Sequence, residues 1–376
     1  MSEHDLLGDA IERLEWDERG SSTSPSKRAQ ITRRTALTGA AAGLVATVLE
    51  ACGSSAGSNT KTTGNESKSA AASVFGNSTA FKFVMVSHAT ADQFFIPTQN
   101  GAADACQLLG CSYQWTGSAA NHVGQMLGAI QTATDARADG IATTIVDPTA
   151  FDAPVENALA AGIPVITYNS DAPSSHRLAY IGQDLYRSGK EMGVRIRQLV
   201  DAGVEVALFI ATPGSSNLQP RVDGVEDALQ GSGIALNVVG SAATLADAVT
   251  TIEAFVQAHP DYRGFFAVDA GSTAAVAAAL QKYGLTQKGV VGGGFDVLPS
   301  TAQLLASGDL DFTIDQQPYL QGFLSILELY LHKVSQGLTG TATVDTGIKF
   351  LDKQTDQTYE DTKSRFEGTG TAPGVS

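Results

Sequence analysis

The sequence predicts an α/β protein with two doubly wound lobes, each built on a parallel sheet. The first observation is a regular alternation of strand-like runs and helix-like segments from Phe81 onward. The second is that the runs are short and rich in β-branched and aromatic residues, as expected where helices cover both faces of a sheet. The third is their number, because nine or more such runs fit two sheets of about five strands better than one.

The elements follow one another without long interruptions. Strands are expected at 81–87, 112–116, 141–146, 164–168, 178–181, 205–211, 235–241, 264–268, 289–295 and 311–314. Segments with helical spacing, such as 121–140, 186–203 and 273–284, separate them, and several end at a Gly in the C-cap position. The seam between the lobes is expected near Gly182 and Gln183, where a short strand leads straight into a helix.

The chain before this alternation predicts an export signal. Arg33 and Arg34 precede an apolar run from Ala36 to Leu49. That run is about 14 residues long, too short for a membrane-spanning helix of roughly 20. Twin arginines indicate the pathway that exports folded proteins. We therefore expect residues 1–52 to be a twin-arginine signal and residues 53–80, rich in Gly, Ser and Thr, to be a flexible linker.

The signal ends in "LEAC", which resembles the lipoprotein signal of bacteria, with Leu49 and Ala51 before Cys52. Glu50 departs from the small residue usual at its position. Lipidation of Cys52 would tether the exported protein to the outer face of the cytoplasmic membrane, in the periplasm, through the lipid anchor only. The alternative is a cleaved signal with an incidental cysteine.

Charge and cysteine content exclude several classes of partner. A net charge of −15 argues against a nucleic-acid partner, which would require a basic face. Cys106 and Cys111 are too far apart for a CxxC redox pair, and no Cys or His cluster suggests zinc. No metal and no cofactor is therefore expected. A disulfide between these two cysteines and separate packing of the two thiols both stay open.

Polar residues recur directly after the predicted strands. They are Asp92 with the adjacent Phe94 and Phe95, then Asp147, Asn169, Arg221, Asp269, Asp296 and Gln316. In open parallel sheets, ligands bind beyond the carboxyl ends of the strands. Any one of these residues could instead cap a turn. As a set they suit a small neutral sugar or polyol, because each hydroxyl both donates and accepts and phenyl rings cover the C–H face.

Seven segments, in order, resemble the type I periplasmic sugar-binding proteins, the ribose/galactose-binding group of ABC importers. The segments are "DQFFIPTQNGA", "IVDPTAFDAPVENALAAGIPVITYNSDAP", "YIGQDLYRSGKEMG", "RVDGVEDAL", "HPDYRGFFAVDAGSTAAVAAAL", "VVGGGFDVLP" and "LDFTIDQQPYLQGF". The resemblance implies a three-segment hinge near Gln183, Gln316 and Asp345. It implies an N-terminal lobe of residues 81–182 plus 317–343, a C-terminal lobe of 183–316 plus 344–366, and a disordered tail of 367–376.

The resemblance also implies roles for residues of the N-terminal lobe. Phe94 and Phe95 match the aromatic pair that sandwiches the sugar, and Asp92 stands where ribose binders usually have Asn. Asp147 occupies a position that is commonly Asn and would bond to ring hydroxyls. Asn169 falls on the Asp of the family's Asp-Arg pair, of which the Arg is also replaced.

In the C-terminal lobe, Arg221 matches the family's second-lobe arginine and Asp269 replaces an Asn. Asp296 matches the Asp of the Gly-Phe-Asp turn, and Gln316 matches a glutamine beside the hinge. The aromatic wall expected in this lobe falls near Ala243 and is missing. These departures favour a different sugar or a linear polyol over ribose.

The expected function is that of a monomeric binding protein, not an enzyme, that captures a monosaccharide or polyol by hinge closure and delivers it to an ABC permease. An alternative is a sensory receptor that hands the bound sugar signal to a chemoreceptor or histidine kinase. A glycosidase is disfavoured, because its carboxylates would flank one scissile bond rather than surround a pocket. Trp115 and His88 are expected to be structural.

Overall fold

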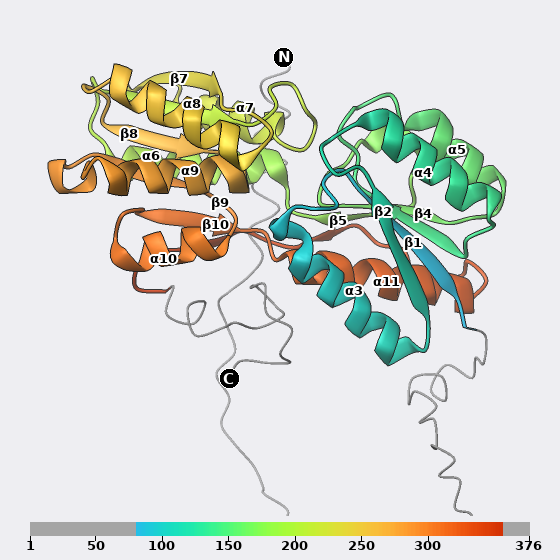
Figure 1. The fold of residues 1–376 in the computed structure, drawn as a ribbon. Helices are drawn as coiled ribbons and strands as arrows, with labels where there is room; N and C mark the ends of the chain where they lie inside the picture. Colours follow the sequence, from blue (N-terminus) through green and yellow to red (C-terminus); the bar gives the residue numbers. More distant parts are fainter. Residues whose placement is uncertain (1–79, 356–376) are drawn as a thin grey trace, which may run out of the picture. The chain divides into compact units, whose positions relative to one another are not determined.

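The computed structural model describes residues 80–355, in which twelve strands form two six-stranded sheets (Figure 1). The N-terminal sheet has the order β11-β5-β4-β3-β1-β2 and is parallel throughout. Its strands are β1 (Lys82–Ser87), β2 (Ser112–Gly117), β3 (Gly140–Thr143), β4 (Val165–Tyr168), β5 (Tyr180–Gly182) and β11 (Val344–Asp345).

The C-terminal sheet has the order β12-β10-β9-β8-β6-β7, and β12 alone runs antiparallel to its neighbour. Its strands are β6 (Glu205–Ile210), β7 (Ala235–Gly240), β8 (Gly264–Ala267), β9 (Val291–Phe295), β10 (Phe312–Asp315) and β12 (Lys349–Leu351). The predicted fold class, two α/β lobes with parallel sheets, is confirmed.

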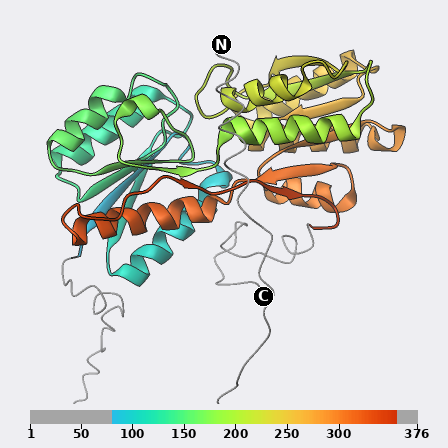
Figure 2. The ribbon, with the colours of Figure 1, turned by 180° about the vertical axis from the view of Figure 1, so that it is seen from behind.

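Helices cover both faces of each sheet (Figures 1 and 2). The N-terminal lobe has α3 (Ile96–Leu109), α4 (Val123–Asp135), α5 (Asp152–Ala160) and α11 (Pro318–Val334). The C-terminal lobe has α6 (Leu185–Leu199), α7 (Gln219–Leu229), α8 (Leu245–Ala258), α9 (Ala270–Lys282) and α10 (Pro299–Ser307). Three short 3₁₀ turns complete the described elements: η1 (Gln93–Phe95), η2 (Pro173–Ser175) and η3 (Thr286–Lys288).

Strand β1 illustrates why the central strands are mostly apolar. Successive side chains of a strand point to opposite faces of the sheet. Phe83 and Met85 lie in one hydrophobic cluster with buried residues of α3 and α11. Val84 and Val86 lie in another, with buried residues of α4 and α5. Because both faces are buried, a polar residue on either side would lose its hydration, and the run reads as continuously hydrophobic.

The chain crosses between the two sheets three times: after β5, after β10 and after β11. The last crossing corrects one predicted boundary. Val344 and Asp345 pair with β5 of the N-terminal sheet, so they do not open the C-terminal segment predicted at 344–366. The remaining lobe limits stay predictions. The predicted signal with Cys52, most of the linker 53–80 and the tail 367–376 lie outside the described residues.

Side chains tie the three crossings together. From the first crossing, Gln183 donates through Nε2 to the carbonyl of Gly347 at 3.0 Å. From the third, Thr346 donates through Oγ1 to the carbonyl of Gln316 at 2.8 Å, and its own carbonyl accepts from Gln317 Nε2. The third segment is thus bonded to both of the others.

Cys106 and Cys111 are free thiols at the carboxyl end of α3, so the structure has the unpaired alternative rather than the disulfide. Within residues 80–355, no group of His, Cys, Asp and Glu side chains could hold a metal ion. No helix in the same range has the length and hydrophobicity needed to cross a bilayer.

Candidate functional site

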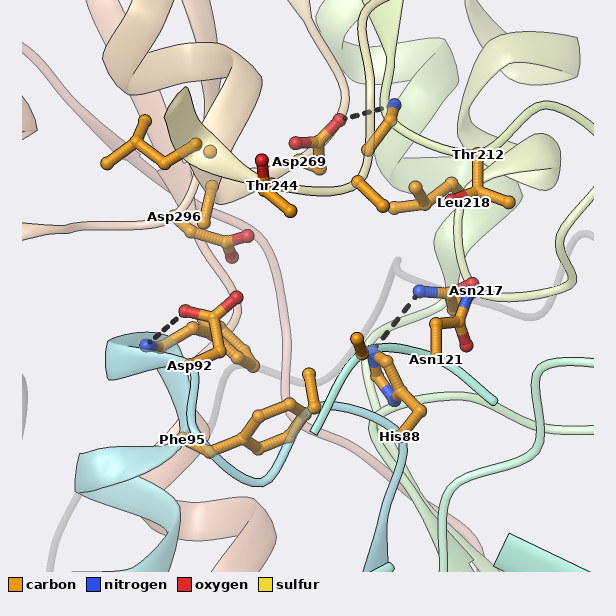
Figure 3. A pocket seen from close by; sticks show the side chains of 18 of the residues that line it. His88, Asp92, Phe95, Asn121, Thr212, Asn217, Leu218, Thr244, Asp269 and Asp296 are labelled. Carbon is orange, nitrogen blue, oxygen red and sulfur yellow. Dashed lines mark hydrogen bonds between the residues drawn. The ribbon is translucent and has the colours of Figure 1, made fainter. Parts of the chain in front are cut away.

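A pocket of about 420 Å³ is lined by both lobes (Figure 3). Every lining segment follows the carboxyl end of a strand. The lining residues are 88–89 and 91–95 after β1, 119–121 after β2, 169 after β4, 211–212, 217–218 and 221 after β6, 242–245 after β7, 269–271 after β8, 296 and 298 after β9 and 316 after β10. This is the position at which open parallel sheets bind ligands.

Eight of the nine predicted site residues line this pocket. They are Asp92, Phe94, Phe95, Asn169, Arg221, Asp269, Asp296 and Gln316. Segments separated by more than 200 residues in the sequence therefore meet in one cavity. Whether each side chain touches a ligand stays a prediction.

Asp147 is not among the lining residues. Its Oδ1 accepts hydrogen bonds from the backbone N–H of Thr149 at 3.0 Å and of Ala150 at 2.8 Å. These two bonds hold the pKa of the Asp147 carboxyl below its usual range, and the bond from Thr149 has the larger effect. Asp147 is therefore placed as a cap of the turn after β3, outside the lining of this pocket.

We expect Asp147→Ala to leave ligand affinity within about twofold of wild type, because the side chain lies outside the pocket. Loss of the cap should destabilise the fold by about 1 kcal/mol and lower the melting temperature by a few degrees. Asp147→Asn, which keeps an acceptor oxygen, is the matched control for thermal unfolding. A tenfold loss of affinity in Asp147→Ala, measured by calorimetric titration, would return this residue to the binding site.

The aromatic pair divides into a buried support and a pocket wall. Phe95 is buried and packs edge-to-face against Phe94, with ring centroids 4.8 Å apart. The ring centroid of Phe95 also lies 5.8 Å from that of Trp115 and 6.4 Å from that of Tyr168, and Trp115 packs, partly buried, against the core cluster that contains Phe95. Phe94 is half-buried and also packs against a small apolar cluster of the C-terminal lobe that includes Leu298. Both rings line the pocket, and Phe94 is the more exposed of the two.

Arg221 is the cation that lines the pocket, and it is 2% exposed. Its guanidinium lies 4.0 Å from the ring centroid of Phe295. Nη1 donates to the carbonyl of Val268 at 2.8 Å, and Nη2 donates to Gln183 Oε1 at 3.1 Å. Nε is buried without a hydrogen-bond partner. Burial lowers the pKa of Arg221 from its ordinary value. The ordinary value of an arginine is so high that the side chain stays charged.

A close approach of two helices places Arg221. A Cβ on Gly189 of α6 would lie 2.1 Å from the carbonyl oxygen of Arg221 on α7. Any larger residue at this position would push the two helices apart and move the guanidinium. The glycine in α6 is therefore a requirement of the site as well as of the packing.

Three further polar side chains that line the pocket are linked by hydrogen bonds. Asn169 donates through Nδ2 to Gln316 Oε1 at 3.2 Å, and Gln316 donates through Nε2 to Asp296 Oδ1 at 2.7 Å. Asn169 and Asp296 have positive φ angles of 63° and 72°, which cost conformational energy in residues other than glycine. Burial raises the pKa of Asp296 to about 7, and the nearby Arg221 opposes this shift.

Asp269 lines the pocket but is largely occupied by the protein itself. Its Oδ1 accepts from the N–H of Ser272, at the start of α9, at 2.8 Å. Its Oδ2 accepts from the N–H of Ala211 at 3.0 Å and from the hydroxyl of Ser272 at 2.9 Å. Burial nevertheless raises its pKa. Asp269 therefore acts as a helix cap and joins two pocket loops, with little acceptor capacity left for a ligand.

Several lining residues were not predicted as site residues. They include His88, which was expected to be structural, together with Asn121, Thr212, Asn217, Leu218, Thr244 and Leu298. Most lie a few residues beyond a strand end rather than directly after it, so a longer window after each predicted strand would have found them. Ala243 lines the pocket, as the missing aromatic wall implied.

Comparison with known proteins identifies the family. Residues 83–334 match the model of the periplasmic binding protein domain. The xylose/arabinose-binding protein XylF of Sulfolobus acidocaldarius is 45% identical over 306 residues, covering 78% of this chain and 76% of the relative. The ribose import binding protein RbsB of Escherichia coli is 28% identical, covering 60% of this chain and 75% of the relative.

Solved structures agree with these sequence matches. An ABC transporter solute-binding protein of Burkholderia graminis in complex with D-arabinose has a TM-score of 0.70 at 27% identity, covering 74% of this chain and 97% of its own. A carbohydrate transporter of Acidothermus cellulolyticus in complex with myo-inositol has a TM-score of 0.66 at 26% identity, covering 75% of this chain and 97% of its own. With its two lobes and the pocket they line, the chain belongs to the periplasmic binding protein family, among its type I sugar-binding members.

Proposed function

We propose that this exported protein captures a neutral monosaccharide, first of all a pentose of the xylose or arabinose type, and delivers it to an ABC importer. The observation that carries the proposal is a single pocket in which the two lobes gather amides, carboxylates, one guanidinium and a phenyl ring. The names of XylF and of the arabinose-bound structure support a pentose, and the myo-inositol complex supports a related polyol as second choice.

Each lobe would supply part of the hydrogen-bond set. The guanidinium of Arg221 can donate to a sugar oxygen, and the Asp296 carboxylate can accept from a hydroxyl. Phe94, from the N-terminal lobe, can cover the apolar face of the ring. A ligand that bonds to both lobes stabilises the arrangement in which they are closest, so binding favours closure about the three crossings.

The test is a thermal-shift screen of pentoses, hexoses, inositols and linear polyols, followed by calorimetric titration of the hits. We expect D-xylose or D-arabinose to raise the melting temperature, since a ligand that binds only the folded state stabilises it. Small-angle scattering should then show a smaller radius of gyration with the sugar than without it. A protein that responds to none of these compounds, or that binds without compaction, would contradict the proposal.

The relatives do not favour the sensory alternative, because those matched by sequence are named as sugar-binding or import binding proteins. They do not favour an enzyme either. The carboxylates Asp92, Asp269 and Asp296 come from three different loops of the pocket. Asp269 moreover already accepts hydrogen bonds from backbone and hydroxyl donors. It is therefore not free to serve as the acid or the nucleophile of a glycosidase pair.

We further propose that the twin-arginine signal exports the chain and that a lipid on Cys52 anchors it as a monomer. The sequence "LEAC" supports this part of the proposal. Cys52→Ala should move the protein from the membrane fraction to the soluble exported fraction, because lipid chains supply the membrane affinity. Cys106→Ala, which keeps the signal intact, is the control. A Cys52→Ala protein that stays with the membrane would contradict lipid anchoring.

A further inference from the structure

Two thiols lie together at the junction between α3 and β2, outside the binding site. Cys106 is in the last turn of α3, and Cys111 follows the helix directly before β2. Figure 1 shows the chain turning back at this end of the helix to enter β2. The pocket lies at the other end of α3, which Phe94 and Phe95 precede, and neither cysteine lines it. The proposed function therefore gives these thiols no role.

The backbone brings the two cysteines to one place. Gly110 ends α3 with a left-handed φ angle of 70°. Beyond it, the N–H of Cys111 donates to the carbonyl of Cys106 at 3.1 Å. This bond from the sixth residue back to the first is the mark of a Schellman motif, in which the side chains at these two positions commonly touch. The two thiols thus occupy a pair of positions at which side chains normally meet.

The two thiols differ in their access to solution. Cys106 is buried, at 6% exposure, in the hydrophobic cluster that joins α3 to α11, whereas Cys111 packs against that cluster and is only partly buried. Hydrogen bonding between the two side chains raises the pKa of Cys106 and lowers that of Cys111. Cys111 is therefore the thiol that ionises more easily and meets a reagent first, with Cys106 behind it.

We propose that Cys106 and Cys111 are an oxidative modification site, at which the exported protein closes a disulfide that fastens the end of α3 to β2. The free thiols of the structure are the reduced form of this pair. Closure requires little movement, because the backbone bond already holds the two Cα atoms near the separation that a disulfide spans. Disulfides form and persist in the oxidising compartments that exported proteins enter.

The oxidant is an organic disulfide, either a small molecule or the disulfide of a thiol oxidoreductase. The Cys111 thiolate attacks one sulfur of the oxidant, forms a mixed disulfide and releases the other sulfur as a thiolate. Cys106 then loses its proton and attacks Sγ of Cys111, which releases the second thiolate. Two protein thiols are oxidised to one disulfide, the oxidant is reduced to two thiols, and these take up the two protons.

The experiment uses the full chain with Cys52→Ala, which we call the two-thiol protein because only Cys106 and Cys111 remain. Folded protein is incubated with oxidised glutathione, and its thiols are counted after unfolding. The count should fall from two to none, with a mass loss of about 2 Da, two hydrogen atoms, and no retained glutathione. The oxidised form should melt about 3–6 °C above the reduced form, because the closed loop restricts the unfolded chain.

Single variants of the two-thiol protein test the order of attack. Cys106→Ala should retain glutathione on Cys111, because no second thiol is present to release it. Cys111→Ala should react at least roughly tenfold more slowly, because its one remaining thiol is buried. Equal rates of reaction in the two variants would contradict the assignment of Cys111 as the attacking thiol.

The proposal is overturned if the two-thiol protein keeps both thiols or stops at the mixed disulfide. It is overturned as well if oxidation leaves the melting temperature unchanged or lowers it, since the bond would then fasten nothing. These readouts decide the matter even if a single variant fails to fold. They involve no sugar, so a protein that binds none of the screened compounds contradicts the proposed function alone.

Discussion

Arg221→Ala should weaken sugar binding by roughly 100-fold or more, because the guanidinium is the charged donor in the pocket wall. Arg221 lines the pocket, and its guanidinium keeps N–H groups beyond those bonded to Val268 and Gln183, which a ligand oxygen can accept. Hydrogen bonds that involve a charged group contribute more than neutral ones, about 1.5–3 kcal/mol each. The variant also removes the positive charge that lowers the pKa of Asp296, so this carboxyl would be more fully protonated and a poorer acceptor.

Calorimetric titration of Arg221→Ala with the best sugar of the screen measures the effect. The unliganded melting temperature should change by only a few degrees, because removing a buried cation also removes its desolvation cost. Arg221→Lys, which keeps the charge but loses the planar fork, should give an intermediate affinity. Arg177→Ala, which breaks an ion pair with Asp171 outside the pocket, should bind normally. An affinity of Arg221→Ala within fivefold of wild type would remove this residue from the site.

Asp296→Asn should make the unliganded protein more stable at neutral pH while it abolishes most of the sugar affinity. Burial raises the pKa of Asp296 from 3.8 to about 7. The folded state therefore binds a proton that the unfolded state has already lost, and the stability contributed by this group is lost as pH rises from about 4 to 7. Asparagine cannot ionise and can still accept from Gln316. The gain should reach a few kcal/mol above pH 7, as an order of magnitude.

Denaturant unfolding across this pH range tests the sign of the effect. The stability difference between Asp296→Asn and wild type should be small near pH 4 and grow toward pH 7. Asp311→Asn is the control, because burial also raises the pKa of Asp311 while its carboxylate accepts from Gly292 N–H outside the pocket. That variant should keep the affinity for sugar. If Asp296→Asn is less stable than wild type at neutral pH, the carboxylate is a structural support rather than a strained binding group.

Most of the fold could be predicted from the sequence, because strands covered on both faces leave an unmistakable pattern. The run that forms β1 is apolar at every position from Phe83 to Val86, and the same holds for β6 from Val206 to Ile210. The strands β11 and β12 were missed because two and three residues are too few for any periodicity. Their pairing is decided by the third crossing, which is a tertiary contact.

The site was predicted less completely, because a polar residue after a strand can either face the pocket or cap its own loop. Asn169 and Asp296 face the pocket with positive φ angles, a conformation that depends on the surrounding packing. Asp147 turns back on its own loop instead. The sequence carried one signal for this, because Asp followed by Pro and Thr favours a turn in which the Asp side chain caps the backbone. Asn121 was missed because it lies four residues beyond the end of β2.

Two glutamines link side chains of the pocket to the three crossings. Gln183 holds Arg221 with its carbonyl oxygen and the third crossing with its amide nitrogen. Gln316 bonds to Asn169 and Asp296 through its side chain, while its backbone carbonyl accepts from Thr346. A change of ligand that moves these side chains would therefore also change hydrogen bonds at the crossings, and not only contacts in the pocket. Evolution or design that alters which sugar is preferred will also alter how easily the lobes swing, so selectivity and mobility in this protein cannot be adjusted one at a time.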